Sequence, residues 1–328
     1  MLKPLFLLVF TSAFLIPQEI YAQKVGEKAP SVKGNRWLNT SAPPKWKYLS
    51  GRLILIYKFT VKLTCPPCEG MIQRLNELQF QYRKRGLVII AVCADLDDAG
   101  EITEYIETHG MRVPVLILGA PDYKTTTVPH AWLVDPSGEI AWVDTASKLS
   151  SDQIEELLKD ARMIPRFKVP DAIKKAHKHV ESQSIGKAMA ELESYLEKPK
   201  SKKVARKAKR ALKAMKSFAK AELDAVDKFA GDGDYAEGIE ILERISRAYK
   251  KTEPGDKATE KLKAWKRDRA IKLELKAANL LEKAFQLILG DEKSKAHAIA
   301  LVRKLAKSKK YEGTRTQKRA IVLLKDWD

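Results

Sequence analysis

The fold is decided within residues 52–71, which read RLILIYKFTVKLTCPPCEGM. The first eight residues form a short run of mostly apolar and β-branched side chains, a composition typical of strands buried at the centre of a sheet. Cysteines follow at positions 65 and 68, directly before a segment with helical spacing of apolar residues. The stretch therefore predicts a buried strand that leads, through a cysteine pair, into a helix.

The chain on either side has the pattern of an α/β domain over residues 23–163. In the helix after the cysteines, the residues expected on the apolar face are Met71, Leu75, Leu78, Phe80 and Tyr82, and Gly86 is the expected stop. Further strands are expected over 87–93, 113–118, 130–134 and 139–144, the last two as a hairpin, and further helices over 98–109 and 151–162. This order predicts a mixed sheet covered on both faces.

The cysteine pair carries the chemistry. If Cys65 is the N-cap, Pro66 and Pro67 occupy the first helical positions, where their fixed φ suits the helix and where they offer no N–H group. A Cys65 thiolate then has the N–H of Cys68 as its main donor. The helix dipole favours this thiolate, whereas Glu69 opposes it. We therefore expect a redox-active pair.

Two other interpretations of the pair are weaker. A structural zinc site needs four ligands, usually two cysteine pairs or one pair with two histidines. The chain has one such pair, and no matching spacing occurs among its five histidines, which are His109, His130, His177, His179 and His297. A permanent structural disulfide stays open, but a ring closed across two residues stabilises a fold much less than a bridge across a long loop.

Three motifs in order carry a family resemblance: Val25-Gly26-x-x-Ala29-Pro30, the strand with its cysteine pair, and 127–138, which read TVPHAWLVDPSG. Residues 25–162 thereby resemble the thioredoxin-like proteins of the TlpA/ResA type, which are exported thiol-disulfide oxidoreductases. The resemblance implies Cys65 as the nucleophile, Cys68 as the resolving thiol and a cis bond at Val128-Pro129. It also implies substrate contacts, which we expect at Thr64, Pro66, Pro67, Val128 and Pro129.

Several residues depart from the patterns of related proteins. Thr64 stands where the family commonly has tryptophan, and we expect it to widen access for a protein substrate. Family members often carry a polar or acidic residue below the pair. The nearest residues here, Lys58 and Thr60, are not convincing general bases. A peroxiredoxin would need a threonine at the position of Lys62, so peroxidase activity is disfavoured.

Two residues near the motifs leave alternatives open. His130 follows Pro129 and could join the cysteines in a copper-handling protein, because Cu(I) favours soft thiolates. Alternatively, His130 is simply the first residue of a strand. Cys93 ends an apolar strand, where a free cysteine behaves as a small hydrophobe, with a role as third redox partner as the alternative. We expect no bound cofactor or metal.

The N-terminus resembles a signal peptide over residues 1–22. Lys3 precedes an uncharged apolar run from Leu5 to Ile16, and Ala22 offers a small side chain at the cleavage point. This run is too short to span a bilayer comfortably. We expect export to the periplasm or cell envelope, where disulfides persist.

The second half of the chain is basic and cysteine-free. Residues 23–164 carry 18 basic and 17 acidic side chains, whereas residues 165–328 carry 42 and 24, an excess of +18. Export and the lack of interleaved aromatic residues argue against nucleic acid. An acidic envelope polymer or an anionic membrane surface is more compatible. Solvated faces of lysine-rich helices are the simpler explanation.

Residues 164–171 are the expected linker, and 172–328 an all-helical domain. Met189 and Leu192 recur at Ile239 and Leu242, an offset of 50, which indicates TPR-like helical hairpins, with an irregular bundle as the alternative. Together the patterns predict an exported thiol-disulfide oxidoreductase that acts on protein or small-thiol disulfides with a redox partner protein. The alternative is a non-catalytic adaptor that works through the basic helices.

Overall fold

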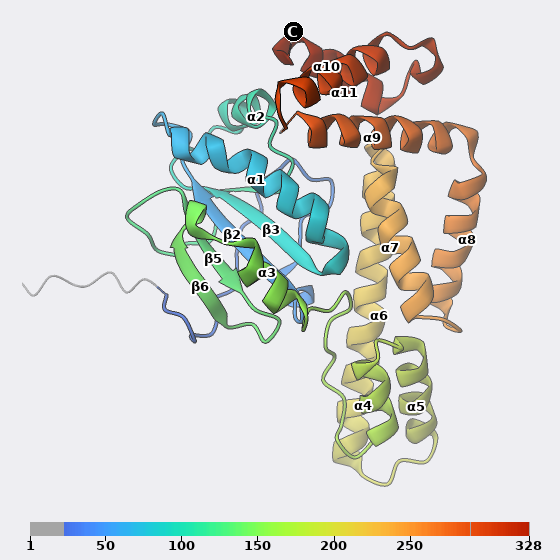
Figure 1. The fold of residues 1–328 in the computed structure, drawn as a ribbon. Helices are drawn as coiled ribbons and strands as arrows, with labels where there is room; N and C mark the ends of the chain where they lie inside the picture. The colour runs from blue at the N-terminus through green and yellow to red at the C-terminus, as the bar shows by residue number, and fades with distance from the viewer. Residues whose placement is uncertain (1–22, 289, 328) are drawn as a thin grey trace, which may run out of the picture.

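The computed structural model describes residues 23–288 and 290–327, so the expected signal peptide lies outside the described residues. A six-stranded sheet lies beside a set of helices (Figure 1). The strands are β1 (Trp37–Leu38), β2 (Leu53–Phe59), β3 (Leu87–Cys93), β4 (Val115–Ile117), β5 (His130–Val134) and β6 (Ile140–Thr145), in the spatial order β1-β4-β3-β2-β5-β6. The apolar runs of the sequence thus form the centre of the sheet, as predicted.

The sheet is mixed, which confirms the prediction from element order. β2 pairs in parallel with β3, and β3 in parallel with β4, whereas β5 runs antiparallel to both β2 and β6. β2 lies between β3 and β5, with Ile56 opposite Ile90 on one side and Trp132 on the other. The strand that leads to the cysteines is therefore held on both edges.

Both faces of the sheet are covered, also as predicted. One face packs against α1 (Pro66–Tyr82), α2 (Ala99–Thr108) and α3 (Ser151–Leu158) in a common apolar cluster. The opposite face packs against the segment that precedes β2, through residues such as Val32, Trp46 and Leu49. Odd-numbered residues of β2 face the helices and even-numbered ones face this segment, because strand side chains alternate.

Three sequence-based expectations need correction. Phe80 is 42% exposed rather than part of the apolar face of α1, because it lies nine positions after Met71 and therefore on the opposite side of the helix. The helix expected over 151–162 ends at Leu158, since the Arg162 N–H bonds to the carbonyl of Gly51 at 2.7 Å instead. The two-residue strand β1 was not expected at all, because so short a segment has no periodicity to read.

The second half is helical, as predicted. Its helices are α4 (Lys174–Glu181), α5 (Ile185–Glu197), α6 (Lys202–Gly231), α7 (Tyr235–Ala248), α8 (Glu253–Arg267), α9 (Arg269–Leu287), α10 (Glu292–Lys307) and α11 (Arg315–Trp327). They form two apolar clusters, one built mainly by α4 to α8 and one by α9 to α11. No helix within residues 23–288 and 290–327 combines the length and the apolar character that a membrane span requires.

Ion pairs and an aromatic contact join the helices to the first half. Arg83, after α1, pairs with Glu237 and Glu240 of α7, while the Tyr48 ring packs edge-on against Phe218 of α6, with 5.4 Å between centroids. Arg112, after α2, pairs with Glu282 of α9 at 3.1 Å. These contacts place α9, and with it α10 and α11, beside α1 and α2 (Figure 1).

Candidate functional site

The cysteine pair caps the start of α1. Cys65 is the N-cap, Pro66 and Pro67 hold the first helical positions, and the Cys65 sulfur accepts the Cys68 N–H at 3.2 Å. The two cysteines form a disulfide, with their Cα atoms 5.2 Å apart. The capping geometry expected from the sequence is confirmed, and it aims a backbone donor at the Cys65 sulfur.

The two sulfurs differ in access. Cys68 is 0% exposed, whereas Cys65 is half-buried and the side chains of Thr64, Pro66 and Pro67 around it are exposed. Leu63, two residues before Cys65, is 71% exposed. A partner molecule can therefore reach Cys65 and not Cys68, and it would meet a largely apolar rim.

The Val128-Pro129 bond is cis, as the family resemblance implied. Val128 is half-buried and packs against the same apolar cluster as Cys65, while Pro129 is buried. The Pro129 carbonyl accepts the N–H of Ala146 at 3.2 Å, which ties this segment to the residue that follows β6. The fold thus brings the Val128 segment to the cluster on which the cysteines lie.

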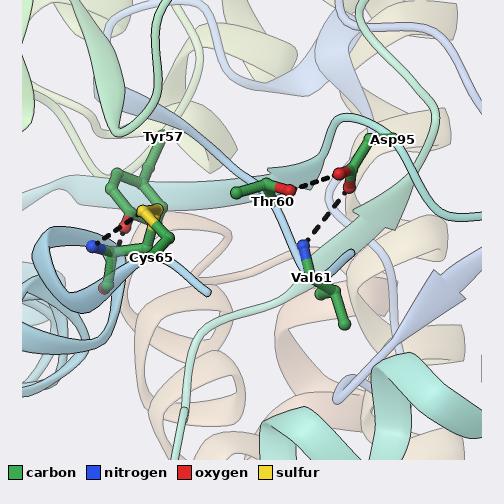
Figure 2. The surroundings of a disulfide bond; sticks show 6 residues. Tyr57, Thr60, Val61, Cys65 and Asp95 are labelled. Atoms are coloured by element: carbon green, nitrogen blue, oxygen red, sulfur yellow. Dashed lines mark hydrogen bonds between the residues drawn. A yellow bond between two sulfur atoms is a disulfide. The ribbon is translucent and has the colours of Figure 1, made fainter. Parts of the chain in front are cut away.

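Tyr57 supports the pair from the sheet. Its hydroxyl donates to the backbone carbonyl of Cys68 at 3.1 Å (Figure 2). Burial raises the pKa of Tyr57 far above its usual value, and Tyr105 adds to this rise. The hydroxyl therefore stays protonated and holds the first turn of α1 against the sheet.

Asp95 is a site residue that the sequence analysis missed. Its carboxylate accepts hydrogen bonds from the Thr60 hydroxyl and from the Val61 N–H, the latter at 3.3 Å (Figure 2). β2 and β3 are parallel with Phe59 opposite Cys93, so the segments after both strands lie side by side. Asp95 thereby fixes the segment that leads to Cys65.

A signal for Asp95 was available in the sequence. An acidic residue stands two positions beyond the second buried strand, and the carboxyl ends of neighbouring parallel strands meet at one edge. The candidates expected near the pair, Lys58 and Thr60, both come from the segment before the cysteines. Lys58 on β2 faces the other side of the sheet, where it donates to the carbonyl of Tyr123 at 2.9 Å.

Cys93 and His130 lie in the sheet. Cys93 is buried, and burial raises the pKa of its thiol, so its interpretation as a core residue is confirmed. His130 begins β5, stacks edge-on against Trp132 at 4.7 Å, and has its pKa lowered by burial. Within the described part of the chain, no three His, Cys, Asp or Glu side chains are grouped so that they could hold a metal ion.

The mixed sheet and the disulfide at the start of α1 give the first half of the chain a thioredoxin-like α/β fold. Residues 25–143 match the model of the AhpC/TSA family. Among curated proteins, the thiol-disulfide oxidoreductase ResA of Bacillus thuringiensis subsp. konkukian is 31% identical over 99 residues, which are 29% of this chain and 56% of that protein. ResA of Halalkalibacterium halodurans is 29% identical over 98 residues, 29% of this chain and 54% of the relative.

The chain thus spans about half the length of the curated relatives it matches. Two solved structures are also similar. One is a putative thiol:disulfide interchange protein DsbE from Chlorobium tepidum, with 20% identity, a TM-score of 0.35, and coverage of 42% of this chain and 99% of that one. The other is the thioredoxin domain of a thiol-disulfide oxidoreductase from Bacteroides vulgatus, with 19% identity, a TM-score of 0.34, and coverage of 42% and 97%.

The difference in access predicts the order of alkylation. We expect iodoacetamide to label Cys65 first in the reduced native protein, because its sulfur is reachable and faces a backbone donor. Cys93 should be labelled only after unfolding in urea, since it is 0% exposed and burial raises the pKa of its thiol. Mass spectrometry of digested samples gives the order. Equal labelling rates of Cys65 and Cys93 in the native protein would contradict this assignment.

The role of Asp95 predicts a loss of stability. Replacement by asparagine (Asp95→Asn) removes a charged acceptor from the Thr60 hydroxyl and the Val61 N–H, so we expect the free energy of unfolding to fall by about 1–2 kcal/mol. Urea unfolding of the oxidised protein measures it. The control is Asp122→Asn, an exposed position where the change should stay within about 0.5 kcal/mol. Equal effects of the two substitutions would argue against the role of Asp95.

Proposed function

We propose that this protein is a thiol-disulfide oxidoreductase that acts on protein or small-thiol disulfides through Cys65 and Cys68. The observation that carries the proposal is a disulfide at a helix N-terminus with one reachable and one buried sulfur. Nucleophilic and resolving thiols need this asymmetry, because only the first must meet the substrate. The similarity of residues in the first half to ResA supports the same activity.

The exchange proceeds in two balanced steps. The reduced Cys65 thiolate attacks a substrate disulfide, forms a bond to one substrate sulfur and releases the other as a thiolate. The Cys68 thiolate then attacks the Cys65 sulfur, which re-forms the Cys65–Cys68 disulfide and releases the second substrate thiolate. Two electrons pass from the pair to the substrate, and the protons lost by the cysteines are taken up by the released thiolates. The reverse sequence oxidises a substrate dithiol.

The surroundings of the pair fit these roles. The N–H of Cys68 and the start of α1 stabilise negative charge on the Cys65 sulfur, while Glu69 in the first turn opposes it. Exposed Thr64, Pro66 and Pro67 would frame the incoming chain, and the Val128-Pro129 segment would form its other wall. In this proposal Asp95 and Tyr57 position the pair rather than touch the substrate.

We further propose the organisation 1–22 signal peptide, 23–163 thioredoxin-like domain, 164–171 linker and 172–328 helical domain. Ile164 and Phe167 pack into the apolar cluster of α4 to α8, which supports a boundary close to residue 163. The uncharged apolar run near the N-terminus supports export to the periplasm or cell envelope. There the pair would meet protein thiols and a redox partner protein.

The helical domain offers a basic surface for docking in that compartment. Exposed basic side chains on α6 are Lys202, Lys203, Arg206, Lys207, Lys209 and Arg210. Such a surface would attract an acidic envelope polymer or an anionic membrane surface at long range, and salt would weaken the attraction.

The mechanism predicts that Cys68→Ser stops exchange halfway. The Cys65–substrate bond would then accumulate, because no thiol remains to resolve it, and turnover should fall to the uncatalysed rate. Non-reducing gels and mass spectrometry of envelope extracts detect the trapped partners. Cys65→Ser is the matched control and should trap nothing. Two results would contradict the proposed oxidoreductase function. One is that Cys68→Ser forms no mixed disulfide, and the other is that Cys65→Ser restores the phenotype of cells that lack the protein.

Export predicts that the mature protein begins at Gln23. We expect the full chain, produced in a Gram-negative host, to reach the periplasmic fraction without residues 1–22. Mass spectrometry of the intact protein from that fraction measures this loss. A charge in the apolar run should block processing, so Leu8→Arg is the comparison variant. An unprocessed wild-type chain in the cytoplasmic fraction would refute export.

A further inference from the structure

The C-terminal helices form one wall of a cavity of about 410 Å³ beside the start of α1. The opposite wall comes from α1 and from the end of α2. The lining residues that matter for recognition are Glu69 and Gly70 of α1, Glu107 of α2, Phe285 of α9, and Leu323 and Trp327 of α11. The two halves of the chain therefore share one cavity. Figure 1 shows the ribbons of α9 to α11 beside those of α1 and α2.

This cavity begins within one helical turn of the reactive sulfur. Glu69 directly follows Cys68, and its N–H donates to the Cys65 carbonyl at 3.1 Å. Gly70, the next residue, is exposed and carries no side chain, and a Cβ placed there would meet no atom within 4 Å. A polypeptide joined to Cys65 can therefore lie over this turn and enter the cavity.

Contacts between protein side chains hold the helical wall in place. The Arg112 guanidinium lies 4.3 Å from the centroid of the Phe285 ring and pairs with Glu282. Phe285 in turn packs edge-on against Trp327 at 5.4 Å. The start of α11 is held by buried Glu274, whose carboxylate accepts the N–H groups of Arg315 and Thr316 at 2.8 and 2.9 Å.

The charge of the cavity is opposite to that of the helical half. The lining carries two carboxylates, Glu69 and Glu107, together with His109, and no lysine or arginine lines it among the residues the structure describes. The guanidiniums of Arg112 and Arg319 lie over the Phe285 ring, 4.3 and 6.0 Å from its centroid, without lining the cavity themselves. This contrasts with the excess of +18 over residues 165–328. The two carboxylates complement a cationic side chain, and the aromatic wall complements an apolar side chain next to it.

We propose that this cavity binds the substrate polypeptide beside its reactive cysteine and selects segments that carry lysine or arginine together with an apolar residue. The cationic side chain would pair with Glu69 and Glu107, and the apolar one would pack on Phe285 and Trp327. The inference rests on the proposed oxidoreductase function. It assigns the helical domain a direct part in choosing substrates.

The test is a single-turnover reaction of the pre-reduced full chain with cysteine peptides, each joined to thionitrobenzoate as a mixed disulfide. One peptide carries Lys and Leu beside the cysteine, a second Glu and Leu, and a third only Gly and Ser. Release of thionitrobenzoate gives the rates. At low ionic strength we expect the basic peptide to react about three- to fivefold faster than the acidic one, and the ratio to shrink with salt.

Substitutions in the cavity and outside it test whether the preference for basic peptides arises there. Glu107→Lys should invert the ratio in favour of the acidic peptide, whereas Glu101→Lys, an equal charge change on another side of α2, should leave it as in the wild type. Peptides that carry Leu should react faster than the Gly-Ser peptide. Trp327→Phe should keep most of this difference in rate, whereas Trp327→Ala should lose most of it.

The outcomes separate the two proposals. A normal rate with the Gly-Ser peptide but equal rates for the basic and acidic peptides would overturn the inference and leave the oxidoreductase standing. The same shift with Glu101→Lys as with Glu107→Lys would also overturn it, because the preference would then reflect overall charge. Failure of all three peptides to react would remove the oxidoreductase function, and the inference with it.

Discussion

The hydrogen bond from the Cys68 N–H to the Cys65 sulfur is the contact on which the rest of the site depends. It exists because Cys65 is the N-cap and because Pro66 and Pro67 contribute no N–H of their own to the first turn. A helix that began one residue earlier or later would bury Cys65 or turn Cys68 outward. The start of α1 therefore sets both the electrostatics of the pair and the difference in access between its sulfurs.

The sheet fixes where that helix begins. β2 is paired along both edges, with β3 and with β5. A shift in its register would break the hydrogen bonds to both neighbours, so the end of β2 and the connection to Cys65 are fixed in position. Tyr57 then holds the first turn from below, and Asp95 holds the connecting segment from the end of β3. The support comes from two neighbouring parallel strands, which is why Asp95 meets the segment that leads to Cys65 although 30 positions separate the two residues.

Much of this was readable from the sequence, and the failures have physical causes. Apolar runs predict the central strands, and the cysteine–proline pattern predicts the N-cap of α1. Both predictions succeed because each depends only on residues that are neighbours in the chain. Hydrophobicity alone places Phe80 in the core, whereas its angular position on α1 turns its side chain toward solvent. The order of the strands suffices to place Asp95 at the edge of the sheet where β2 ends, whereas its contact with Val61 depends on the register between β2 and β3. The aromatic wall could not be predicted from the sequence, because the packing of Phe285 against Arg112 depends on how the two halves of the chain contact each other.

That docking also explains how the charge is distributed. Acidic residues of the helical half form ion pairs with the first half: Glu237 and Glu240 with Arg83, and Glu282 with Arg112. Part of the acidic charge of the helical half is therefore neutralised where the two halves meet. Its basic excess is left on surfaces such as the exposed face of α6. Next to the disulfide, by contrast, the helices present aromatic side chains, and the acidic groups come from α1 and α2. Beside Cys65, the near-neutral half therefore supplies the sulfur and the acidic groups, and the basic half supplies the aromatic side chains of Phe285 and Trp327.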